Sequence, residues 1–112
     1  HGMSPMLSHL VHNGHMEPRA YGQKECLEAG IQFARTEGIM PAPEATHAIK
    51  GAVDEALKCK AEGKSKAILF NLCGHGHFDM QAYMDYFSGN LAEDKFDTEA
   101  FEESMASIPA VN

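Results

Sequence analysis

Apolar side chains recur at the three-to-four-residue spacing of a helix face in several stretches of the chain. Residues that favour helix ends bound these stretches. Ser4-Pro5 can begin a helix, because serine caps free N–H groups and proline fits the first turn, whereas glycines such as Gly38 can end one. The pattern predicts four helices, from Ser4-Pro5 to Asn13-Gly14, over 23–37, over 44–62, and from Asp79 to about Gly89.

One stretch has the pattern of a buried strand. Within residues 66–72, the run Ala67-Ile68-Leu69-Phe70 is apolar without alternation, as strands of parallel sheets are. Residues 16–21 are a weaker candidate, because Pro18 would confine them to a sheet edge. Strands mixed with helices indicate an α/β fold. Two strands cannot cover this many helices, so we expect the rest of the sheet to come from sequence outside the chain or from a partner chain.

The 112 residues suffice for one domain. The sequence begins with His1-Gly2-Met3 rather than an initiator methionine, so we expect a piece of a longer protein. Residues 92–112 are acidic and poor in large apolar groups. We therefore expect a packed unit over 1–91 and an acidic tail, weakly helical or loose, over 92–112.

Charge and composition exclude several classes of protein. Nine basic and 16 acidic side chains give a net charge of −7, which opposes binding to nucleic acid or to an anionic membrane. The longest apolar run is far too short to span a bilayer. The three cysteines, at positions 26, 59 and 73, are odd in number and far apart, which argues against a disulfide framework and for the cytoplasm.

The turn after the predicted strand is the best candidate site. In open α/β sheets, ligands bind beyond the carboxyl ends of the strands, where Cys73-Gly74-His75-Gly76 would lie. The glycines let the backbone approach a ligand closely, and Cys73 offers a weak S–H donor or a thiolate. An ordinary tight turn with a buried, inert cysteine is an equally good interpretation.

Three further interpretations concern single side chains. His75 and His77 could bind one metal ion with His47, although the spacing typical of zinc sites is absent. Cys73 could be a nucleophile, although the turn is not G-x-C-x-G and has no identified partner. Glu44, at a predicted helix start, either favours the helix dipole or is a carboxylate aimed into a cleft.

Two separated motifs resemble the tryptophan synthase β chain family. Residues 37–48 resemble its motif E-G-I-x-P-A-x-E-x-x-H-A, and residues 71–76 resemble its strand-to-turn motif N-L-[SC]-G-x-G. The opening His-Gly-Met and the Gly-His-Gly-His-Phe-Asp of residues 74–79 resemble the second, stand-alone β-like type more than the type that pairs with an α subunit. The resemblance covers residues 1 to about 91, the C-terminal part of the catalytic unit.

This resemblance implies a fold, an activity and partners. The fold would be a partial three-layer α/β/α unit of a pyridoxal-phosphate-dependent enzyme, helix-rich with few parallel strands. The full-length enzyme would be a homodimeric lyase that joins serine to indole by β-replacement to give tryptophan, and an α subunit would be compatible but not required. The alternatives are another pyridoxal-phosphate enzyme of this fold, acting by β-replacement or elimination, and a non-catalytic association domain.

The resemblance also implies roles for four residues. Cys73 takes the place of the serine or cysteine that faces the pyridine nitrogen of pyridoxal phosphate, and Gly74 would lie against the ring. Glu44 matches a carboxylate near the ring edge, and Gly2 matches a backbone carbonyl that helps to hold a monovalent cation. The Schiff-base lysine of a His-Lys pair and the glycine-rich phosphate loop of the family have no match here. We therefore expect no catalytic residue within the chain and no activity of the chain alone.

Overall fold

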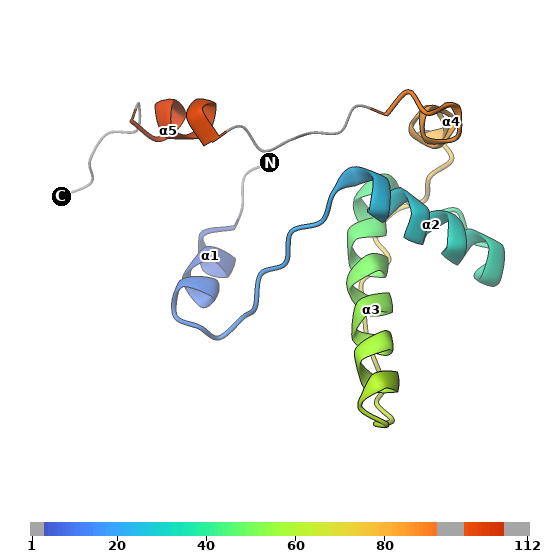
Figure 1. Cartoon of the computed structure of the whole chain (residues 1–112), viewed down its shortest axis with the longest axis horizontal. Helices are drawn as coiled ribbons and strands as arrows, with labels where there is room; N and C mark the ends of the chain where they lie inside the picture. Colours follow the sequence, from blue (N-terminus) through green and yellow to red (C-terminus); the bar gives the residue numbers. More distant parts are fainter. Residues whose placement is uncertain (1–3, 92–97, 107–112) are drawn as a thin grey trace.

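The computed structural model describes residues 4–91 and 98–106. These residues form helices at the places where apolar residues recur with helical spacing, joined by irregular segments (Figure 1). The helices are α1 (Pro5–His12), α2 (Gln23–Glu37), α3 (Pro43–Ala61), α4 (Met80–Ser88) and α5 (Thr98–Ala106).

The predicted helix positions are confirmed to within a residue or two. α2 occupies the predicted residues 23–37, and α3 begins at Pro43, one residue before the predicted start. At the start of α2 the Glu25 carboxylate accepts a hydrogen bond from the Gly22 N–H at 2.7 Å, which satisfies one of the free donors of the first turn. Ser4 precedes α1 as expected, but its side chain makes no capping hydrogen bond.

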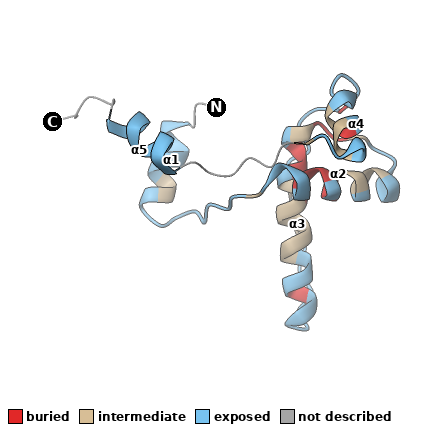
Figure 2. Cartoon of the chain, turned by 45° about the horizontal axis from the view of Figure 1, so that its top comes forward, coloured by how far each residue is buried: buried red, intermediate tan, exposed pale blue. Residues whose placement is uncertain are grey.

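The core lies where α2 crosses the first turns of α3 and meets α4 (Figure 2). Leu27 of α2, Ile49 of α3 and Tyr83 of α4 are each 2% exposed or less. Gly30 is the point of closest approach, because a Cβ added there would overlap the side-chain methyl of Thr46. The absence of a side chain at Gly30 therefore lets α2 and α3 pack at this distance.

The predicted strands do not form among the described residues. Residues 64–72 lie outside helices and strands and return beside α3 (Figure 1), and Leu69 within them is 96% exposed. Residues 16–21 are likewise irregular. The prediction of a buried strand over 66–72 is wrong for this chain, because a strand is completed and covered by neighbouring strands. The described residues thus show a helix-rich unit without the three-layer arrangement.

Several apolar helix faces are exposed for the same reason. α1 buries none of its residues, and on α4 only Tyr83 is buried, whereas Met84 and Phe87 are exposed. The radius of gyration is 16.9 Å, against about 13 Å for a compact domain of about 100 residues. The arrangement is therefore open and leaves apolar surface uncovered.

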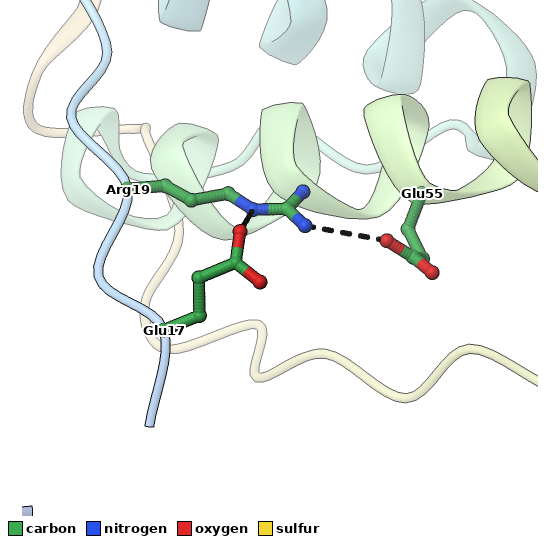
Figure 3. A network of polar contacts seen from close by, with 3 residues as sticks. All are labelled: Glu17, Arg19 and Glu55. Atoms are coloured by element: carbon green, nitrogen blue, oxygen red, sulfur yellow. Dashed lines mark hydrogen bonds and ion pairs between the residues drawn. The ribbon is translucent and has the colours of Figure 1, made fainter. Parts of the chain in front are cut away.

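A polar network ties the segment before α2 to the side of α3 (Figure 3). The Arg19 guanidinium donates from Nε to Glu17 Oε1 at 3.2 Å and from Nη2 to Glu55 Oε2 at 3.3 Å. Tyr21 follows Arg19 by two residues, and the ammonium group of Lys50 lies 5.3 Å from the centre of the Tyr21 ring. These contacts set the path by which the chain enters α2.

Two expectations concern the tail and membranes. α5 lies within the predicted tail and all of its residues are exposed, which fits a weak helix; the other residues of 92–112 lie outside the described residues. The boundary at residue 91 stays a prediction. None of the helices in the described ranges is both long and apolar enough to cross a membrane.

Candidate functional site

The structure brings together the two motifs singled out from the sequence. The Ala42 N–H donates to the Gly74 carbonyl at 3.2 Å, and the Gly76 N–H donates to the Met40 carbonyl at 2.9 Å. Between these bonds, Pro41 and His75 form an antiparallel bridge. We call residues 40–42 and 74–76 together the clamp. It joins the loop before α3 to the turn before α4.

Glycine is required on one side of the clamp. Gly74 has a φ of +87°, in the left-handed region that favours glycine, and a Cβ there would lie 3.3 Å from the Ala42 Cβ. A Cβ on Gly76 would overlap the Pro41 carbonyl oxygen. The close approach seen here is between two segments of the same chain, so the prediction that these glycines let the backbone approach a ligand stays a prediction.

Tyr83, a buried residue of α4, stabilises the clamp through a hydrogen bond. Its hydroxyl donates to the Pro41 carbonyl at 2.7 Å, and the side chain is 1% exposed. Burial, and secondarily the charge of Asp79, raises the pKa of Tyr83 to about 12, so the phenol stays protonated and can donate at neutral pH. Sequence analysis did not predict this bond. The available signal was that a buried tyrosine needs a partner for its hydroxyl.

Cys73 directly precedes Gly74, the first residue on the turn side of the clamp. Its thiol is exposed, whereas Cys26 and Cys59 are buried. The interpretation of Cys73 as a buried, inert residue is therefore wrong. A small, exposed thiol next to a glycine backbone can approach a flat ligand and offer it one weak, neutral hydrogen bond.

Glu44 lies on the other side of the clamp. It is the second residue of α3, two residues after Ala42, and its side chain is exposed. It borders a groove of about 400 Å³ whose other lining residues include Tyr21, Cys26 and His47. Both expected roles of Glu44 suit this position, because the first turn of a helix favours a carboxylate and the groove leaves it accessible.

The histidines form a small aromatic group rather than a metal site. The rings of His75 and His77 lie 4.9 Å apart, and Phe78 lies 5.3 Å from His75. The His77 N–H donates a hydrogen bond to His75 Nδ1 at 3.3 Å. This ring nitrogen is therefore engaged by the backbone of the turn and not by the Cys73 thiol. Within 4–91 and 98–106, no three potential ligands gather to hold a metal ion. Gly2 lies outside the described residues.

The donor set beside the clamp fits a flat aromatic cofactor such as pyridoxal phosphate. Cys73 offers a neutral donor, and Gly74 next to it carries no side chain, although its Cβ position faces the Ala42 Cβ at 3.3 Å. Glu44 adds an accessible carboxylate at the start of α3. These features suit the ring of the cofactor. The described residues include no His-Lys pair and no glycine-rich loop that would match the family's covalent and phosphate sites.

The chain is similar in sequence to several known proteins. No protein-family model matches the chain. It is 62% identical over 91 residues to tryptophan synthase beta chain 2 of Methanosarcina mazei and 55% identical over 93 residues to tryptophan synthase beta chain 2 of Aquifex aeolicus. These matches cover 81% and 83% of this chain and 21% of each relative. The resemblance to the tryptophan synthase β chains is confirmed.

The extent of these matches adds two facts. The chain spans about a fifth of the length of the relatives it matches, in agreement with a fragment of the tryptophan synthase β chain. A match to the tryptophan synthase beta chain of Pyrococcus horikoshii, at 44% identity, extends over 109 residues, or 97% of this chain and 23% of the relative. That match therefore reaches into the acidic tail, for which sequence analysis found no counterpart.

Proposed function

We propose that the chain is the C-terminal part of a pyridoxal-phosphate-dependent lyase that makes tryptophan from serine and indole by β-replacement. The observation that carries the proposal is the clamp. The two motifs that resemble the tryptophan synthase β chain are more than twenty residues apart, yet they are joined by the Ala42–Gly74 and Gly76–Met40 hydrogen bonds. The similarity to relatives with that name supports the proposal independently.

In this proposal the chain forms one wall of the cofactor cleft. The Cys73 thiol faces the pyridine nitrogen as a neutral partner and does not hold a proton on it. Gly74 lies against the ring, and Glu44 lies near the ring edge. When bound, pyridoxal phosphate supplies an electron sink, and a neutral partner for its nitrogen keeps that sink mild, which favours replacement over transamination.

The remaining parts of the site come from outside this chain. No lysine of the chain follows a histidine, and the sequence has no glycine-rich phosphate loop. We therefore propose that the chain alone is inactive. We also propose that the full-length protein is a cytoplasmic homodimer, that an α subunit is compatible with it but not required, and that the Gly2 carbonyl helps to hold a monovalent cation.

Two measurements test this proposal. The full-length protein, supplied with pyridoxal phosphate, serine and indole, should form tryptophan, and a protein that binds the cofactor but forms none would contradict the activity. The isolated chain, incubated with pyridoxal phosphate and reduced with borohydride, should show only scattered, substoichiometric labelling of its lysines. A single stoichiometric lysine adduct would contradict the placement of the covalent site outside the chain.

A further inference from the structure

α4 is connected to both sides of the clamp. At its start, the Asp79 N–H donates to the Gly76 carbonyl at 3.0 Å, which ties the helix to the turn. One turn further on, the Tyr83 hydroxyl donates to the Pro41 carbonyl at 2.7 Å, which ties the same helix to the opposite segment. The helix thus holds together two segments that are far apart in the sequence.

Neighbouring residues enclose the Tyr83 hydroxyl and restrict its position. The side chain is 1% exposed, and its hydroxyl lies beside Gly30 of α2 and the Pro41 carbonyl. A Cβ on Gly30 would lie 3.2 Å from the Tyr83 oxygen and 3.4 Å from Pro41 Cγ, so the glycine provides the space in which the hydroxyl meets the carbonyl. A buried hydroxyl that lost this acceptor would be left without compensation for its desolvation.

From this geometry we infer that Tyr83 is a positioning residue for the cofactor cleft: its bond to the Pro41 carbonyl fixes the clamp and thereby the relative positions of Cys73 and Glu44. Cys73 directly precedes the turn side of the clamp, and Glu44 follows the loop side by two residues. A change in the spacing of the two segments therefore moves the two side chains relative to each other. The inference rests on the proposed function for the identity of the ligand, but not for the existence of the clamp.

The test uses Tyr83→Phe in the full-length protein, with Tyr86→Phe as the matched control. Both substitutions remove one phenol hydroxyl from α4, but Tyr86 borders the groove between α2 and α4 rather than the clamp. The first readout needs no cofactor: hydrogen exchange of peptides that contain the Ala42 and Gly76 amides. Loss of one hydrogen bond should speed exchange in these peptides by about threefold to tenfold, with no change in a peptide from the middle of α3.

The second readout is the absorbance and fluorescence of bound pyridoxal phosphate. Tyr83→Phe should shift these signals and speed cofactor release, because the neutral partner of the ring nitrogen is no longer held in place. Tyr86→Phe should match the wild type in both readouts. Gly76→Ala should reproduce the effects of Tyr83→Phe, because its Cβ would press on the Pro41 carbonyl from the other side, and it serves as the second variant if Tyr83→Phe does not fold.

The outcomes separate the two claims. Faster exchange confined to the clamp together with an altered cofactor signal supports the positioning role. Unchanged exchange at the clamp, a uniform rise across the core, or an unaltered cofactor signal overturns it. If the wild-type protein binds no pyridoxal phosphate, the proposed function fails and the role toward the cofactor fails with it, while the exchange data still decide whether Tyr83 holds the clamp.

Discussion

The backbone N–H of Ala42 donates to the carbonyl of Gly74, 3.2 Å away, across a separation of 32 residues along the chain. This bond places the start of α3 beside the turn that carries Cys73. Glu44 and Cys73, which the family resemblance assigns to one cofactor, therefore flank one backbone clamp. A shared site for the two side chains depends on this pairing.

The first prediction distinguishes a cofactor partner from a nucleophile at Cys73 in the full-length enzyme. Cys73→Ser keeps a small neutral donor, so tryptophan formation should fall by about tenfold or less, or about 1.4 kcal/mol of barrier. Cys73→Asp would hold a proton on the ring nitrogen and strengthen the electron sink, so keto-acid release should rise relative to tryptophan formation. Turnover of both variants and keto-acid release are the measurements.

A nucleophilic cysteine predicts the opposite result for serine. A hydroxyl without a general base is a far poorer nucleophile than a thiolate, so activity would be lost almost completely. If Cys73→Ser abolishes turnover while cofactor binding stays intact, the cofactor-partner role is wrong.

The second prediction concerns helix packing. Gly30→Ala should destabilise the protein by about 1–3 kcal/mol, because the new methyl would overlap the methyl of Thr46. Gly51→Ala, the control in α3, meets its nearest atom only at 3.8 Å and should stabilise the helix by about 0.5–1 kcal/mol. Thermal unfolding of the two variants should therefore shift in opposite directions, and equal shifts would refute the close approach of α2 and α3.

Elements that depend on local interactions could be predicted from the sequence, whereas elements that depend on distant partners could not. The bounds of α2 were predicted correctly because a helix depends on local spacing and local end residues, such as Glu25 at its start. The strand over 66–72 depends on neighbours that the described residues do not supply, so the apolar run around Leu69 lies exposed. An apolar pattern indicates that a segment needs to be covered by other residues, but it does not identify those residues.

The site shows the same division. The family resemblance assigned Cys73, Gly74 and Glu44 to the ring of one cofactor, and these roles stay predictions. It did not predict that Pro41 pairs with His75, because nothing local in either segment specifies a partner more than thirty residues away. The bond from Tyr83 was missed for the same reason.

The third prediction follows from the uncovered apolar surface. The isolated chain should self-associate at micromolar concentration or be only marginally stable, because groups such as Leu69 and Phe87, which are 96% and 64% exposed, favour association. Leu69→Asn should reduce association, whereas Ser65→Asn, at an exposed polar position of the same segment, should not. Sedimentation velocity decides the question, and a monomer that also unfolds cooperatively would contradict the prediction.

The fourth prediction concerns thiol reactivity and pH. Burial raises the pKa of Cys26 to about 11, so little of its thiolate is present at neutral pH. In the isolated chain, alkylation at pH 8 should label the exposed Cys73 first. Labelling of Cys26 should be slow and should rise by about tenfold per pH unit below its pKa. Peptide mapping by mass spectrometry gives both rates, and faster labelling of Cys26 than of Cys73 would contradict the burial pattern.

The most direct test of the central claim is a crystal structure of the full-length protein with pyridoxal phosphate bound. The account predicts that the Cys73 thiol lies within hydrogen-bonding distance of the pyridine nitrogen, with Gly74 against the ring and Glu44 near its edge. It also predicts that the lysine attached to the cofactor lies outside the 112 residues of this chain. A cofactor bound away from the clamp, or one attached to a lysine of this chain, would contradict the account.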